Sequence, residues 1–196
     1  MPLKTQPTLR TCGLALAAAA ALTLSAAPAV WAQSPAPATT KAEDASKLER
    51  GDRKMMEDLA QGNMAEIDAG KMALEKSQNA EVKKFAQQMV DEHGSALADV
   101  QALARAKNLT LPDGAGAMAK TKATALKALS GNLFDKEYAK RSAVGDHEST
   151  LKLLQKIQKD SKDGDLKALA AKMQPTVEHH LMMAKELAAS AAAAKS

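Results

Sequence analysis

Residues 82–103 read VKKFAQQMVDEHGSALADVQAL. Alternating steps of four and three residues through this stretch select apolar side chains with one exception, and that spacing is typical of the buried face of a helix in a bundle. The selected positions are Val82, Ala86, Met89, His93, Ala96, Val100 and Leu103. The exception, His93, is an imidazole among apolar neighbours, where it needs a hydrogen-bond partner or must stay neutral.

The same periodicity predicts four long helices, which cover residues 52–77, 80–107, 132–159 and 165–192. The third and fourth carry His147 and His180 in their apolar rows, so each helix places one imidazole on its inward face. In the first helix we expect an inward row and an edge of small and polar residues. The inward row is Met56, Leu59, Ile67 and Leu74, and the edge is Asn63, Glu66, Gly70 and Ala73.

The connections between the predicted helices limit the topology. The short polar turn after residue 77 predicts an antiparallel hairpin between the first two helices. About 23 residues join the second and third helices, and residues 117–129 within them are predicted to form a short extra helix. This connection either runs back along the bundle, as in ferritin-like folds, or caps one end of it.

The composition favours an all-helical domain. No stretch has the two-residue alternation of a strand, and the chain has only two phenylalanines and one tyrosine. A core of leucine, alanine and methionine suits close helix packing. The sequence therefore predicts an all-α domain over residues 48–192, a four-helix bundle with a long connection between its second and third helices.

The first residues predict export. Lys4 and Arg10 precede an apolar run that ends in small residues, a pattern typical of a secretory signal peptide over residues 1–32 that is cleaved after Ala32. Residues 33–47, rich in Ser, Pro, Ala and Thr, are then expected to be a flexible linker. We expect a periplasmic or secreted protein with no transmembrane segment in the mature chain.

Cleavage would leave a chain without thiols and with little net charge. Cys12 is the only cysteine and lies in the signal peptide, so a disulfide or a cysteine nucleophile is excluded. Removing Lys4 and Arg10 from the 27 basic residues leaves 25 against 23 acidic ones, a net charge of +2. So small a charge gives no support to nucleic-acid binding. Homo-oligomers and protein partners are both compatible with the sequence.

Four polar side chains are predicted to meet at one height in the bundle. Helices of similar length share a middle, and the midpoints of the predicted spans fall within about two residues, or roughly 3 Å, of four positions. These are Glu66, His93, His147 and His180. Such a ligand set suits one transition metal ion, zinc, iron, copper or manganese. The alternative is a structural polar layer, in which the histidines bond to Glu66, Tyr138 or buried water.

Other polar residues beside the histidines are expected to lie outside this layer. Glu92, Asp146 and Glu178 each precede a histidine, but adjacent helical residues do not share a face. These carboxylates are therefore expected to be solvated or paired with lysines, and His179 is expected to face solvent. No catalytic motif with a serine or cysteine nucleophile or a phosphate loop is recognisable, so we do not expect an enzyme.

Four runs carry a resemblance to a known family: GNMAEIDAGKMA, VKKFAQQMVDEH, FDKEYAKRSAVGDHESTL and DLKALAAKMQPTVEHHLMMA. Together they resemble the bacterial family catalogued as domain of unknown function family 4142, over about residues 51–190. The resemblance implies an exported, ferritin-like four-helix domain of unassigned activity. It also implies that four residues lie on recurrent polar positions of the family, namely Glu66, His93, His147 and His180.

The chain departs from di-iron ferritins, which place a Glu-x-x-His pair on each of two helices. The residues three positions before His93, His147 and His180 are all valines. A carboxylate-rich two-iron centre is therefore not expected, and a single histidine-rich metal site is the predicted centre. The competing interpretation is a non-catalytic envelope stress or interaction protein whose polar layer is structural.

Overall fold

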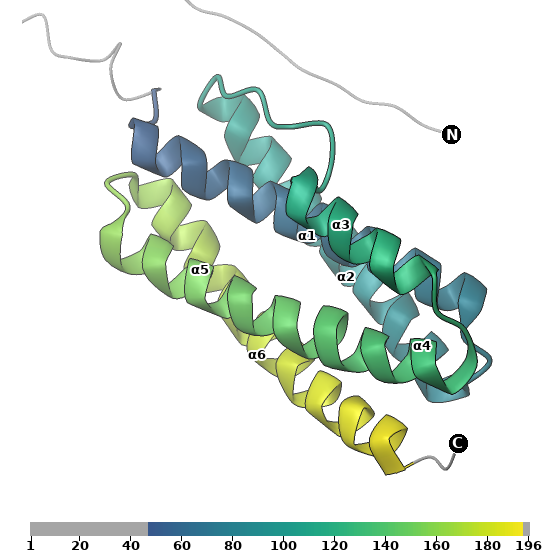
Figure 1. Cartoon of the computed structure of the whole chain (residues 1–196). Helices are drawn as coiled ribbons and strands as arrows, with labels where there is room; N and C mark the ends of the chain where they lie inside the picture. The colour runs from purple at the N-terminus through teal and green to yellow at the C-terminus, as the bar shows by residue number, and fades with distance from the viewer. Residues whose placement is uncertain (1–46, 194–196) are drawn as a thin grey trace, which may run out of the picture. The chain divides into compact units, whose positions relative to one another are not determined.

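The computed structural model describes residues 47–193, which are all-helical and contain no strand. In chain order the elements are α1 (Arg50–Lys76), α2 (Ala80–Ala106), α3 (Gly116–Lys127), α4 (Gly131–Glu137), the π-helix η1 (Tyr138–Asp146), α5 (His147–Asp160) and α6 (Gly164–Ala193). α4, η1 and α5 follow one another without a break, as Figure 1 shows. The predicted signal peptide (1–32) and nearly all of the predicted linker (33–47) lie outside the described residues.

The helix bounds lie within two residues of the predicted ones, and side-chain caps explain where two of the helices begin. Asn79 accepts the backbone N–H groups of Glu81 and Val82 through its Oδ1, so α2 begins directly after it. Asp163 accepts the N–H of Leu166 in the same way at the start of α6. These caps satisfy backbone donors that a helix cannot pair internally.

Contacts between the helices show which way each one runs. α1 and α2 form the predicted antiparallel hairpin (Figure 1). α2 and the continuous α4–η1–α5 helix run in the same direction. The Phe85 ring lies 6.3 Å from the Tyr138 ring, and further along both helices His93 Nε2 lies 3.3 Å from His147 Nε2.

The long connection runs back along the bundle and does not cap it. Lys76 Nζ at the end of α1 donates to the carbonyl of Lys127 at the end of α3, 3.0 Å away. At the other end of α3, Gly116 lies against the side chain of Gln61 in α1. α3 therefore lies beside the second half of α1 and points the same way (Figure 1).

A polar layer divides the apolar core into two clusters. The cluster at one end includes Met56, Leu59, Val100, Leu154, Ile157 and Leu166. The cluster at the other end includes Val82, Phe85, Met89, Phe134, Tyr138 and Leu187. Along each long helix, the residues between the two clusters are buried and polar: Asn63, Glu66, His93, His147 and His180.

The prediction for the inward face of α1 is wrong in part. Ile67 and Leu74 are half-buried at the side of the helix, whereas all four expected edge residues are buried, namely Asn63, Glu66, Gly70 and Ala73. The reason is the close approach of α1 to α2. A Cβ at Gly70 would lie 2.9 Å from a backbone oxygen of α2. The helices therefore contact each other at a glycine, which has no side chain, and not at the predicted leucine.

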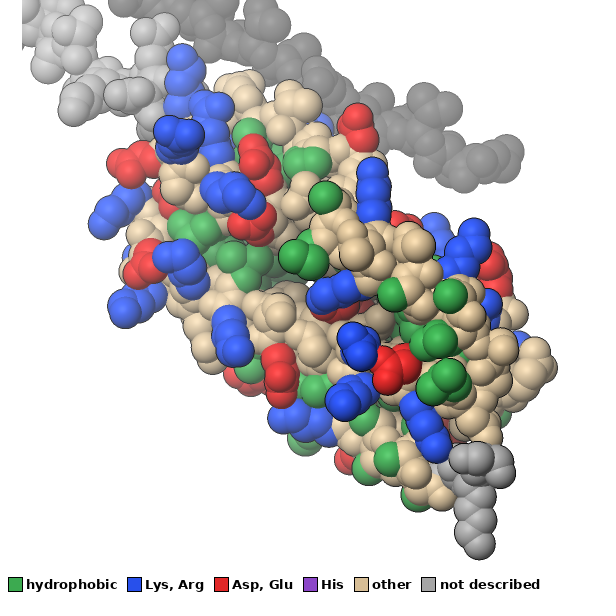
Figure 2. All heavy atoms as spheres, in the orientation of Figure 1, with side chains coloured by type: hydrophobic (Ala, Val, Ile, Leu, Met, Phe, Trp, Pro, Cys, Tyr) green, Lys and Arg blue, Asp and Glu red, His purple; other side chains and the backbone are tan. Residues whose placement is uncertain are grey.

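The exposed surface carries mixed charges. Acidic and basic side chains are interspersed over the face shown in Figure 2, so this face has no extended region of one sign. Among the described residues, three large apolar side chains are exposed, namely Met118, Leu133 and Met182. Within residues 47–193, no helix combines the length and the apolar composition that crossing a bilayer requires.

Candidate metal centre

Three histidines from three different helices converge in the polar layer. His93 comes from α2, His147 is the first residue of α5, and His180 lies in α6. One ring nitrogen from each lies within 4.8 Å of the other two. The ring centroids are 5.3 Å apart in every pair, and each side chain is at most 3% exposed.

Each imidazole has one ring nitrogen occupied by a protein acceptor. His93 donates through Nδ1 to Asn63 Oδ1, 2.9 Å away. His147 donates through Nδ1 to the carbonyl of Ala143 at 2.6 Å. His180 donates through Nε2 to a carboxylate oxygen of α2, Glu92 Oε2, at 2.8 Å.

The second nitrogen of each ring therefore carries a lone pair and no proton. His93 Nε2 and His147 Nε2 face each other at 3.3 Å, and two lone pairs at this distance cannot form a hydrogen bond without a shared proton. His180 Nδ1 is buried and has no partner in the structure. Two acceptor nitrogens thus lie side by side without a donor, and the third ring has a buried nitrogen without a partner.

The pKa values exclude a shared proton at neutral pH. Burial, and after it the neighbouring imidazoles, lower the pKa of His93 to about 3. Burial lowers the pKa of His147 to about 4, although its bond to Ala143 opposes the shift. Burial also lowers the pKa of His180 against the opposing effect of Glu92. All three rings are therefore neutral at pH 7.

The π-helix η1 explains how His147 reaches the layer. Tyr138 and His147 are nine residues apart, so in an α-helix they would lie about 180° apart around the axis. A π-helix has about 4.4 residues per turn, which brings positions nine apart to nearly the same side. Both rings accordingly contact Phe85, each at a centroid distance of 6.3 Å.

The end of η1 also supplies the acceptor for His147. The backbone N–H of His147 donates to the carbonyl of Val144, three residues back. The carbonyl of Ala143, four residues back, is therefore available to the His147 ring. The irregular turn thus both aims the ring and fixes which of its nitrogens carries the proton.

Glu66 belongs to the layer but lies outside the group of three nitrogens. Its Oε1 is 3.5 Å from His147 Nδ1, which is the nitrogen on the other side of the ring from Nε2. Burial, followed by the charge of Asp146, raises the pKa of Glu66 well above its ordinary value of 4.5. Glu66 Oε1 and the nearby hydroxyl of Tyr138 are both buried without a hydrogen-bond partner.

Two residues of the centre, Asn63 and Glu92, differ from expectation. Glu92 accepts from His180 and is not paired with a lysine, because its helix position faces α6 across the bundle. Asp146 does pair with a lysine, Lys122, as expected. Asn63 was an edge residue in the predicted helix, but it holds His93. Its place on the same face as Glu66, three residues earlier, is the pattern that indicates its role.

Comparison with known proteins assigns the chain to a protein family. No curated protein and no solved structure matches the chain. Residues 37–187 match the family described as Domain of unknown function (DUF4142). The match spans most of the chain and includes Glu66 and all three buried histidines. It confirms the family that the motifs resemble, and the chain therefore belongs to the DUF4142 family.

Proposed function

We propose that this protein is an exported, ferritin-like bundle that binds one transition metal ion through His93, His147 and His180. The observation that carries the proposal is the hydrogen-bonding pattern of the three rings. Each N–H has its own acceptor, so one nitrogen of each buried ring keeps a lone pair, and the three ring centroids are 5.3 Å apart. Outer acceptors of this kind fix the tautomer of metal-binding histidines.

The spacing of one nitrogen pair and the type of all three donors suit a small dication. A tetrahedral ion with bonds of about 2.0–2.1 Å holds its ligand atoms roughly 3.3 Å apart. His93 Nε2 and His147 Nε2 are 3.3 Å apart. Imidazole ligands favour zinc, copper or iron over manganese, which prefers oxygen ligands.

Glu66 is in this proposal a buried neighbour of His147 and not the fourth ligand. Its carboxyl group lies beside Nδ1 of the ring, whereas the ion takes Nε2. The outer acceptor that orients the His147 ring is the carbonyl of Ala143, which takes the Nδ1 proton. The ferritin-like assignment is supported by the long connection that makes α2 and α5 parallel.

Metal analysis of the protein purified without a polyhistidine tag tests the proposal. We expect one ion per chain in elemental analysis and in calorimetric titration with zinc, copper or iron. His93→Ala and His147→Ala are expected to lose this ion. His179→Ala is the matched control, because His179 is next to His180 in the sequence but exposed on α6, and it is expected to keep full stoichiometry.

The second candidate is a non-catalytic envelope stress or interaction protein with a structural polar layer. It is favoured by the hydrogen bond that each ring N–H already makes to a protein acceptor, because these bonds form without an ion. This second function would be the remaining one if the protein bound no stoichiometric metal and if zinc, copper, iron and manganese left its melting temperature unchanged. Alanine variants of the three histidines would then lower stability equally with and without metal.

A further inference from the structure

We infer that a divalent metal ion reaches the three histidines through the cavity between α2 and α6, attracted by the carboxylates of Asp99 and Glu92. The inference rests on the proposed metal binding and adds the path of approach. It assigns a role to a surface cavity and to Asp99, which touches none of the histidine partners described above.

The cavity joins the surface to the histidines. It has a volume of about 240 Å³, and two of the three candidate ligands, His93 and His180, form part of its wall. His180 carries the buried Nδ1 that has no hydrogen-bond partner. One of the residues that line the cavity therefore has a nitrogen available to bind an ion. Thr176, an exposed residue of α6, lines the same cavity.

Two carboxylates, Asp99 and Glu92, line the cavity together with His93 and His180. Asp99 and Glu92 are seven residues apart on one face of α2, about 10 Å along its axis. Asp99 is 43% exposed and pairs with Lys172 at 2.8 Å, whereas Glu92 is 41% exposed and bonds directly to His180. Two carboxylates against one lysine give the cavity an excess negative charge, which raises the local concentration of cations.

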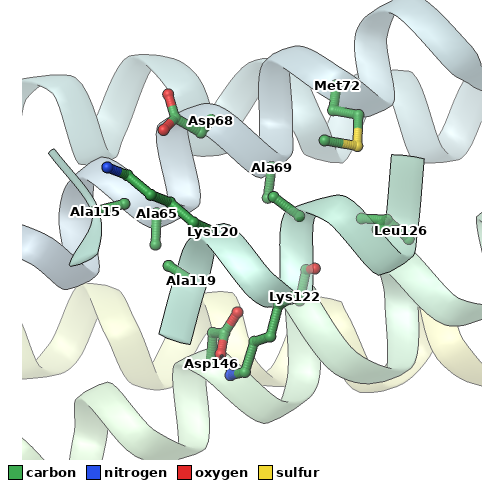
Figure 3. A pocket seen from close by; sticks show the side chains of 12 residues that line it. Ala65, Asp68, Ala69, Met72, Ala115, Ala119, Lys120, Lys122, Leu126 and Asp146 are labelled. Atoms are coloured by element: carbon green, nitrogen blue, oxygen red, sulfur yellow. Dashed lines mark hydrogen bonds and ion pairs between the residues drawn. The ribbon is translucent and has the colours of Figure 1, made fainter. Parts of the chain in front are cut away.

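The side of the layer that α3 covers is a poorer path. Cavities of about 60, 210 and 340 Å³ are lined by residues of α3, and no histidine lines any of them. The smallest, shown in Figure 3, has five alanines among its twelve lining residues, Ala65 and Ala119 included. Lys122 extends to Asp146 within it. Its two lysines balance its two carboxylates.

Stopped-flow mixing of the purified protein with Co²⁺, followed by its visible absorption, tests the path. Thr176→Trp should fill the α2–α6 cavity, so association and dissociation both slow at least tenfold while Kd stays within threefold of wild type. Ala119→Trp, which fills the cavity under α3, is the steric control and should leave both rates within twofold.

A second pair of variants tests the charge without adding bulk. Asp99→Asn should slow association about threefold at low ionic strength and leave dissociation unchanged. Asp160→Asn is its control, because Asp160 is also a lysine-paired carboxylate and is 42% exposed, but lies on α5. It should leave association unchanged.

The outcomes separate the path from the proposed function. If wild-type protein shows no Co²⁺ absorption and no titration heat, metal binding itself is wrong and the path falls with it. If Co²⁺ binds at one ion per chain but Thr176→Trp and Asp99→Asn react at wild-type rates, the path is overturned while metal binding stands. Slowing by Ala119→Trp alone would move the path to the α3 side.

Discussion

Asn63 orients His93 through two hydrogen bonds. Its Nδ2 donates to the carbonyl of Leu59 at 2.8 Å, which leaves Oδ1 to accept Nδ1–H of His93 at 2.9 Å. Asn63→Ala removes the acceptor, so the proton is free to move to Nε2, the nitrogen that faces His147. We expect metal affinity to fall about 10- to 100-fold in competition titrations. The free energy of unfolding should fall by about 1–3 kcal/mol.

Asn63→Asp is the matched control for this variant. A carboxylate keeps an acceptor for His93, although it loses the donor to Leu59 and brings a negative charge beside the imidazole, so most of the metal affinity should return relative to Asn63→Ala. Wild-type affinity in Asn63→Ala would mean that the tautomer of His93 does not govern binding.

The three histidines could be predicted from sequence because each interrupts an apolar row at helical spacing. Their partners are harder to predict, for two different reasons. Asn63 lies on the correct face, but the contact line of α1 depends on how closely Gly70 lets α2 approach. Glu92 resembles any other surface carboxylate, and its bond to His180 exists only because α6 packs beside α2.

At the scale of elements, the bounds of the helices follow from periodicity and caps, but the π-helix does not. Steps of three and four back from His147 lead through Val144 to Lys140 and Glu137, whereas the buried aromatic Tyr138 is out of phase with them. This break in phase is the only trace of η1 in the sequence. Its shape follows from a tertiary contact, the packing of Tyr138 and His147 on Phe85.

Gly70 controls the distance between α1 and α2. A Cβ at this position would lie 2.9 Å from the carbonyl oxygen of Ala86 and 2.9 Å from Val90 Cγ2. The Val90 side chain can move, but the backbone oxygen cannot move without its helix. Gly70→Ala should therefore push the helices apart and lower the free energy of unfolding by about 1–3 kcal/mol in denaturant titrations.

Gly62→Ala is the control on the same helix. Its new Cβ would meet only Thr150 Oγ1, at an ordinary 3.8 Å. Alanine is favoured over glycine inside a helix by about 0.5–1 kcal/mol, so Gly62→Ala should stabilise the protein. Equal effects of the two substitutions would contradict a close contact at Gly70.

At the scale of the whole molecule, stability should depend on pH because the four long helices share the polar layer. The histidine pKa is 6.5 in the unfolded chain but about 3 for His93 and about 4 for His147 in the folded protein. Below pH 6.5 the unfolded state therefore binds more protons. Near pH 5 each of these residues lowers the free energy of unfolding by about 2 kcal/mol.

Melting curves of the metal-free protein check this prediction. The melting temperature should fall from about pH 6.5 toward pH 5, because the histidine contribution is lost there. His179→Gln, which changes an exposed histidine, should reproduce the wild-type profile. A level melting temperature down to pH 5 would contradict a layer of buried neutral histidines.

Glu66 contributes to the same profile with the opposite sign. Burial raises its pKa well above 4.5, so the folded protein keeps a proton that the unfolded chain releases. Its stabilising contribution is full below pH 4.5 and is lost as pH rises through the raised pKa. Glu66→Gln cannot titrate, so its stability relative to wild type should increase with pH. A constant difference between the two proteins in melting curves from about pH 5 to pH 9 would contradict this assignment.

Metal should change the pH profile in a way that a purely structural layer cannot. An ion that binds only the folded state stabilises it by about 2.7 kcal/mol at a free concentration of 100 times Kd. Protons compete with the ion for the same nitrogens, but the folded-state pKa is about 3 for His93 and about 4 for His147. This competition should therefore begin only near pH 4. We therefore expect the difference in melting temperature between zinc-loaded and chelator-treated protein to persist at pH 5 and to shrink only toward pH 4. His147→Ala should abolish the difference and His179→Ala should preserve it, whereas a difference that persists in His147→Ala would place the ion at another site.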